Sequence, residues 1–166
     1  MRDELSQSMA MKKNTGTAIP PWPPGLLSAA GQDTDATQEE PEAAQARHKA
    51  EQYAEYMLHH LGILPGFFGH KYFWYAITLC VLDPTKLELL TKTLYPAIAH
   101  RYATTVPCVE RSMRYVLTHS LAVRPDTMAH WNEFFEPFLI YKKDKKPTIG
   151  IFITMVAALY HTESNG

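Results

Sequence analysis

The chain has 166 residues, 46% of them hydrophobic, and its 16 basic and 17 acidic residues give a formal net charge of −1. This size and composition allow one globular domain with a buried core, plus a tail. No apolar stretch is long enough to span a membrane, because the most apolar segment runs only from Ile149 to Tyr160. We therefore expect no membrane partner.

Residues 1–46 predict a disordered acidic tail that contains prolines. Seven acidic and three basic residues occur there, with four prolines between Pro20 and Pro24 and few large apolar side chains. Such a segment buries too little apolar surface to offset the entropy lost on folding. Lys12 and Lys13 are not followed by an apolar run of signal-peptide length, so we expect a cytoplasmic protein.

Residues 47–166 predict one helical domain. Helix-forming residues take over from about Pro41, and Gly62 is expected to end the first helix. The apolar stripe of that helix consists of Ala50, Tyr53, Ala54, Met57, Leu58 and Leu61. We place the domain boundary near Arg47.

An aromatic-rich apolar block from Phe67 to Val81 predicts the buried central helix of this domain. Asp83 and Pro84 end the block. Because Asp83 can act as an N-cap and Pro84 suits a first helical turn, a further short helix is expected. That helix should run through Leu94 directly into the next segment.

The stretch from Tyr95 to Val123 predicts a helix-turn-helix, because its two helices are joined by a turn too short to be a linker. Pro96 suits the first turn of the first helix, which should end near Ala103. Thr104 and Thr105 offer a hydroxyl N-cap for the second helix. The second helix should bury a face made of Val109, Met113, Val116, Leu117 and Ser120.

The opposite face of this second helix carries polar and aromatic groups. Its members are Cys108, Glu110, Arg111, Arg114, Tyr115, Thr118 and His119. Donors, an acceptor and an aromatic hydroxyl suit a DNA major groove, although the alternative is a helix pair of the kind found in any all-α domain. From Lys92 to Arg124 five basic residues stand against one acidic residue, and this net charge of +4 favours a polyanionic partner.

The remaining segment predicts two more helices around a basic loop. Pro125 breaks the preceding helix, and Asp126 should cap one that buries Met128, Trp131, Phe134 and Phe135. Residues 138–148 hold four lysines and one aspartate, which indicates either a solvated connection or a phosphate contact. Thr148 should cap a final helix. The predicted fold is all-α: a compact multi-helix bundle containing a helix-turn-helix, preceded by a disordered tail.

Several short motifs carry a resemblance to a known family. They are LGI from Leu61, LYPAIAHRYATT from Leu94, VER from Val109 with Arg114 after it, and KPT from Lys146. From Leu61 to about Leu159 the chain resembles the C-terminal DNA-binding effector domain of the stage-zero sporulation protein A, the response regulator of Firmicutes sporulation. The resemblance does not include the receiver domain. It implies an all-helical DNA-binding unit that acts in transcription regulation.

The resemblance also implies a recognition helix at about residues 106–122, placed in the major groove. The implied DNA-binding residues are Arg101, Thr104, Thr105, Cys108, Glu110, Arg111, Arg114, Tyr115 and Thr118. Where this chain has PCVERSMRY, family members show SRVERAIRH, so Cys108 and Tyr115 replace an Arg and a His that contact DNA in the family. Losing one arginine contact to guanine should cost ~1–3 kcal/mol of discrimination. Glu110 and Arg114 agree with the family, and they suit either base reading or a surface ion pair.

Two further expectations depend on the family comparison. After KPT the family segment is more polar than Ile149 to Ile151 of this chain, which predicts an extra exposed apolar patch. Without a receiver domain, the chain should not be controlled by phosphorylation and should be constitutive or regulated by abundance and partners.

Catalytic and metal-binding motifs are absent from the sequence. It has no glycine-rich phosphate loop, nucleophile elbow, Cys/His metal cluster or motif-placed carboxylate pair, so we expect no enzyme activity, no cofactor and no metal. Two functions stay open. One is a sequence-specific transcriptional regulator that binds double-stranded DNA, with a possible homodimer on DNA. The other is a helical protein-interaction module that binds or antagonises a full-length sporulation regulator.

Overall fold

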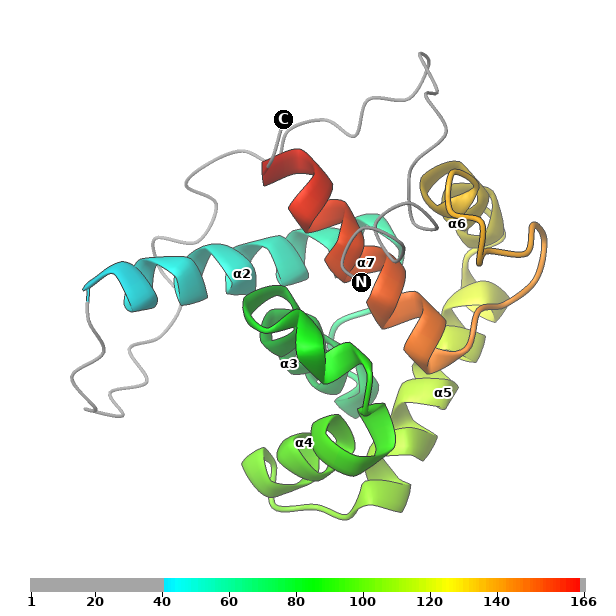
Figure 1. Cartoon of the computed structure of the whole chain (residues 1–166). Coiled ribbons are helices and arrows are strands. Elements are labelled where there is room, and N and C mark those ends of the chain that lie inside the picture. The colour runs from blue at the N-terminus through cyan, green and yellow to red at the C-terminus, as the bar shows by residue number, and fades with distance from the viewer. Residues whose placement is uncertain (1–40, 165–166) are drawn as a thin grey trace.

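The computed structural model describes residues 41–164, which form helices and no β-strand (Figure 1). The elements are α2 (Pro41–His60), α3 (Phe68–Leu82), the 3-10 helix η1 (Pro84–Leu87), the π-helix η2 (Leu90–Leu94), α4 (Tyr95–Arg101), α5 (Val106–Val123), α6 (Thr127–Phe135) and α7 (Ile149–Ser164). This confirms the predicted all-α fold. The predicted tail lies outside the described residues except for residues 41–46. The domain boundary near Arg47 stays a prediction, since α2 begins at Pro41 and its first buried side chain is Ala50.

Helix α2 ends at a Schellman motif around Gly62. The Ile63 N–H donates to the Leu58 carbonyl over 2.9 Å, and the Gly62 N–H donates to the His59 carbonyl over 3.1 Å. Gly62 has a φ of +75°, a left-handed conformation that glycine adopts without strain. Ile63 and Leu58 are both buried, which supplies the apolar contact that usually accompanies this motif.

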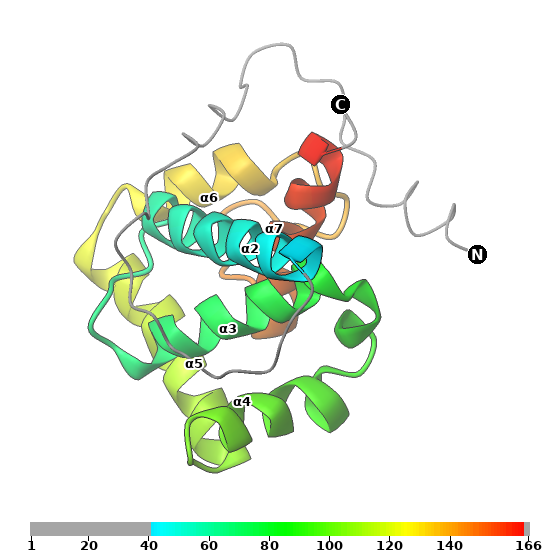
Figure 2. The same cartoon turned by 90° about the vertical axis from the view of Figure 1, so that its left-hand side faces the viewer.

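Helix α3 is the central element of the fold. It packs against α2, α5 and α7, and both views place it between α2 and the helix-turn-helix (Figures 1 and 2). Its residues have an unusually apolar composition, and most of its length is buried, as the aromatic-rich block predicted. Cys80 lies on its buried side, where burial raises the pKa of the thiol to about 12.

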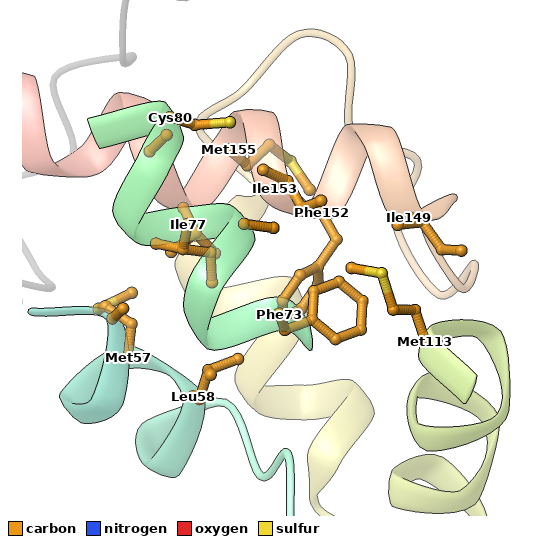
Figure 3. Packing of buried hydrophobic residues seen from close by; sticks show 14 of the residues in the cluster. Met57, Leu58, Phe73, Ile77, Cys80, Met113, Ile149, Phe152, Ile153 and Met155 are labelled. Carbon is orange, nitrogen blue, oxygen red and sulfur yellow. The ribbon is translucent and has the colours of Figure 1, made fainter. Parts of the chain in front are cut away.

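The core is organised around the Phe152 ring of α7. Its centroid lies 5.1 Å from the ring of Phe73 on α3, and 5.7 Å and 5.6 Å from the rings of Trp131 and Phe135 on α6. All four residues are fully buried. Figure 3 shows Phe73, Phe152 and Met113 of α5 pointing into one shared core, so the helix-turn-helix is part of the same packed unit as the scaffold.

Buried polar atoms of the scaffold are matched by hydrogen bonds between distant elements. The Trp131 indole N–H donates to the Leu61 carbonyl over 2.8 Å, and the Tyr53 hydroxyl donates to the Val156 carbonyl over 2.6 Å. Because an unmatched buried donor costs about 1–3 kcal/mol, these bonds fix how α2 meets α6 and α7.

The segment between α3 and α4 differs from the single short helix that the sequence predicted. Asp83 does cap a helix there, and its carboxylate accepts from the Thr85 N–H over 3.1 Å. That helix stops at Leu87, however, and a separate π-helical turn then leads into α4. The prediction failed because Leu89 has a non-helical backbone and is exposed, while only Leu94 of this segment is fully buried.

The exposed apolar patch predicted at the start of the last helix is absent. Ile149 is buried and Ile151 is partly buried. A Cβ added at Gly150 would lie 2.6 Å from a methyl carbon of Leu90, so Leu90 covers this turn of α7. As predicted, Thr148 caps α7, because its hydroxyl accepts from the Ile151 N–H over 3.3 Å.

In the part of the chain that the structure describes, no helix combines the length and the apolar character needed to cross a bilayer.

Candidate nucleic-acid interface

The turn of the helix-turn-helix is closed by Ala103. Helix α4 ends in a second Schellman motif, in which the Thr104 N–H donates to the Ala99 carbonyl over 2.9 Å and the Ala103 N–H donates to the His100 carbonyl over 3.3 Å. Ala103 has a φ of +49°, so an alanine occupies the left-handed position that usually holds glycine. The turn therefore fixes the angle between α4 and α5 (Figure 1).

Helix α5 begins where the sequence predicted. The Thr105 side chain accepts from the Cys108 N–H over 3.4 Å, and a proline follows in the first turn. The face predicted to be buried is buried in full: Val109, Met113, Val116, Leu117 and Ser120. The opposite face is therefore turned away from the core.

A close crossing of α3 and α5 positions that outward face. A Cβ added at Gly69 would lie 2.2 Å from the backbone oxygen of Ser112 and 2.8 Å from a methyl carbon of Val116. Only glycine allows the two helices to approach this closely. The sequence signal for this contact is a glycine in the first turn of a predicted helix.

The exposed face of α5 brings most of the predicted site residues together. Thr105, Cys108, Arg111, Arg114, Tyr115 and Thr118 are exposed, while Thr104 and Glu110 are half-buried. Arg111 makes no hydrogen bond or ion pair with another described residue. Its guanidinium group is therefore available to a ligand.

Arg114 and Glu110 form a hydrogen-bonded ion pair along the helix surface. The sequence left open either base reading or a surface ion pair for these two residues, and the structure shows the ion pair. Both side chains lie near Tyr95 of α4, whose pKa is raised mainly by burial and further by the Glu110 charge, while Arg114 lowers it. Arg114 is thus engaged within the protein, in contrast to Arg111.

Cys108 occupies the first turn of α5 and is exposed. Hydrogen bonding to the Thr105 hydroxyl, followed by Thr104 and the Arg111 charge, lowers the pKa of its thiol. The thiol is compact and exposed, so a longer side chain at this position would extend further from the helix.

The lysine-rich loop reaches α5, which the sequence did not predict. The Lys146 ammonium donates to the Thr118 hydroxyl over 2.8 Å, and that hydroxyl donates to the Arg114 carbonyl over 3.1 Å. The loop is also tied to α6, because the Asn132 side-chain oxygen accepts from the Asp144 N–H over 3.0 Å. Lys146 therefore stands beside the C-terminal half of the exposed face, whereas Lys143 lies 3.8 Å from a carboxylate oxygen of Glu136.

Arg101 lies at the end of α4 and packs on the scaffold. Its guanidinium carbon is 5.4 Å from the centre of the Tyr75 ring of α3, a cation–π distance. The side chain is exposed, and it contacts Tyr75 of α3 and its neighbour Tyr102.

A separate pocket of about 410 Å³ lies between the ends of α2 and α5 and helix α6. It is lined by His59, His60, Arg124, His130, Glu133 and Phe134. Burial, followed by the neighbouring His59 and His130, lowers the pKa of His60. Within residues 41–164 no three His, Cys, Asp or Glu side chains are grouped so that they could hold a metal ion.

One family model matches this chain. Its description is "Sporulation initiation factor Spo0A C terminal", and the match covers residues 54–159, well over half of the sequence. The matched region begins within α2 and ends within α7, so it includes most of the core, the helix-turn-helix and the lysine-rich loop. This chain therefore belongs to the Spo0A C-terminal family, the DNA-binding effector domains of sporulation initiation factors.

Proposed function

We propose that this protein is a sequence-specific transcriptional regulator that places α5, at about residues 106–122, in the major groove of duplex DNA. The observation that carries the proposal is the outward face of α5. On this face Arg111 has no hydrogen-bond or ion-pair partner among residues 41–164, and the Gly69 crossing and the Thr105 cap hold the helix in place. A rigid helix that presents an uncommitted arginine suits base reading, because arginine is the commonest reader of guanine.

The side chains of the face take different roles in this proposal. Arg111 reads a guanine through two hydrogen bonds. Arg114 contacts a second base or a phosphate. Because its ion pair with Glu110 already orients the side chain, binding costs less conformational entropy. Cys108 offers a thymine methyl group an apolar contact and supplies only a weak donor.

The proposed phosphate contacts come from the edges of the same surface. Thr104 and Thr105 lie at the N-terminus of α5, where hydroxyl and N–H groups bind anions. Arg101 flanks one side, and the lysine-rich loop stands beside Thr118 at the other end. These groups fix the position of the protein on the duplex, while the α5 side chains select the sequence.

Fluorescence anisotropy over a salt series tests for this binding. The logarithm of the affinity should fall linearly with the logarithm of the salt concentration, with a slope of about −0.9 per phosphate neutralised. Replacing the loop lysines with Lys145→Ala and Lys146→Ala should make the slope shallower. Lys49→Ala should not, because Lys49 belongs to α2, a helix that lies across α3 from α4 (Figure 2). Absence of binding even at low salt would reject the proposal. It would favour the protein-interaction alternative, which a pull-down against a full-length sporulation regulator would then examine.

Cys108→Arg tests the reading role of the first turn of α5. An arginine there should add preference for guanine at one base pair, worth about 1–3 kcal/mol, because its guanidinium group can donate two hydrogen bonds to that base. Cys108→Ser is the matched control, since it keeps the small size and adds no charge. If arginine changes affinity for all sequences equally, this turn contacts only the phosphate backbone.

A further inference from the structure

The Tyr115 ring on the exposed face of α5 is held by two other aromatic rings. It stacks on His119, with centroids 5.3 Å apart and an angle of 16° between the planes, and it lies 5.9 Å from the ring of Phe67. Phe67 and His119 are themselves 4.9 Å apart. The Tyr115 hydroxyl lies 3.5 Å from Nδ1 of His119. We call Phe67 and His119 the aromatic bracket.

The bracket depends on how α3 meets α5. Phe67 is the residue before α3, and the Gly69 crossing brings this end of α3 against α5. The neighbouring Phe68 points elsewhere: it is 66% exposed, stacks near Tyr72 and lies under the Lys71 ammonium. Two consecutive phenylalanines therefore have different surroundings, and only the first supports α5.

The bracket restricts Tyr115 without burying it. Tyr115 stays 53% exposed, although its ring packs against the rings of His119 and Phe67, which lie on the same side of it. A side chain held in this way loses little rotamer freedom when it binds a ligand. Tyr115 also follows Arg111 by four residues, so the two lie on one face about 6 Å apart along the helix axis.

We propose that Phe67 and His119 are positioning residues for DNA reading, which hold the Tyr115 ring against a thymine methyl group near the base that Arg111 reads. This inference rests on the proposed function. Phe67 acts from outside the helix-turn-helix and touches no DNA itself. The ring edge supplies the apolar contact that a thymine methyl group accepts in the major groove.

Selection from random duplexes, followed by anisotropy on single-base variants of the selected site, tests the assignment with the full chain. Tyr115→Ala should lower the preference at one base pair by about tenfold. Phe67→Ala should lower the preference at that same base pair by at least about threefold and leave non-specific affinity within about twofold. Phe67→Tyr keeps the ring and should therefore show the wild-type preference at that base pair. Phe68→Ala is the matched control and should behave as wild type.

The double variant Phe67→Ala/Tyr115→Ala gives the sharpest result. If Phe67 acts through Tyr115, the double variant should discriminate no worse than Tyr115→Ala alone. Additive losses would overturn the inference, as would a Phe67→Ala variant with wild-type preference at the Tyr115 position. Phe67→Leu, which keeps apolar volume but lacks the ring, replaces Phe67→Ala if the latter fails to fold.

The outcomes also separate this inference from the proposed function. A clear wild-type motif that is unaffected by Tyr115→Ala and Phe67→Ala overturns the inference alone. A wild-type protein that selects no motif overturns both.

Discussion

At the scale of single residues, Ala103 is the clearest point of backbone strain in the helix-turn-helix. An L-residue with positive φ is disfavoured by about 1–2 kcal/mol because its Cβ approaches the following carbonyl group. Ala103 has this conformation, with a φ of +49°, at the turn that joins α4 to α5. The strain could not be predicted from the sequence, since alanine gives none of the turn signals that glycine or asparagine give.

Ala103→Gly should therefore stabilise the protein. Glycine removes the Cβ conflict but adds entropy to the unfolded chain, so the expected gain in the free energy of unfolding is about 0.5–1 kcal/mol. Urea denaturation measures it. Ala97→Gly, the same change inside α4, should instead destabilise by about 0.5–1 kcal/mol. A loss of stability in both variants would show that the left-handed turn is not the source of strain.

A second prediction at this scale concerns His70 and pH. His70 is buried in the first turn of α3, and its Nε2 lies 3.9 Å from a carboxylate oxygen of Glu55. Burial lowers its pKa, and the Glu55 charge opposes this only in part. The unfolded state, with a histidine pKa of about 6.5, therefore binds the proton more readily than the folded state. This contribution to stability is complete above pH ~6.5 and is lost as the pH falls through that value toward the lowered folded pKa.

Urea denaturation at pH 7.5 and 5.5 checks the His70 prediction. The stability lost by the wild type on acidification should be smaller in His70→Gln, because glutamine takes up no proton. The same substitution at the exposed His59 is the control. Equal losses in wild type and His70→Gln would contradict the assignment.

At the scale of elements, the α3–α5 crossing decides where the exposed face points. Gly69 contacts the backbone of Ser112, and backbone atoms cannot turn aside as a side chain can. A methyl group there must push the two helices apart. The position of α5, and with it the orientation of Arg111 and Tyr115, therefore depends on one glycine.

Gly69→Ala should destabilise the protein by about 2–3 kcal/mol, within the usual cost of overpacking. Gly150→Ala is the control, because its added Cβ would meet only the end of the flexible Leu90 side chain, and alanine favours a helix. Calorimetric unfolding of the two variants compares them directly. A Gly69→Ala protein as stable as wild type would mean that α3 and α5 can separate without loss, and the bracket would then lose its structural basis.

Much of the element scale could be predicted from the sequence, because periodicity and capping residues are local signals. Thr105 and Thr148 cap helices where expected, and the buried face of α5 was predicted in full. The segment from residue 83 to 94 was not predicted correctly, since the backbone of Leu89 leaves the helical region although the sequence carries no helix-breaking residue there. The Lys146–Thr118 contact and the aromatic bracket also join residues far apart in the chain, which no local pattern reveals.

At the scale of the whole molecule, charge is distributed unevenly. The chain is close to neutral, yet the segment from Lys92 to Arg124 has a net charge of +4 and the lysine-rich loop adds four lysines against one aspartate. The Lys146–Thr118 hydrogen bond brings these two basic segments together. A polyanion should therefore approach from the side of α5, and its association should slow as salt screens the charges over about 10 Å.

Selection from random duplexes with the wild type and Arg111→Ala shows whether the outward face of α5 reads DNA sequence. An enriched motif is expected for the wild type. Arg111→Ala should lose about 1–3 kcal/mol of preference at one guanine and keep most of its non-specific affinity. The charge-matched Lys49→Ala variant on α2 should return the wild-type motif. A wild-type protein that binds duplexes but enriches no motif, or an Arg111→Ala protein with an unchanged motif, would contradict the account.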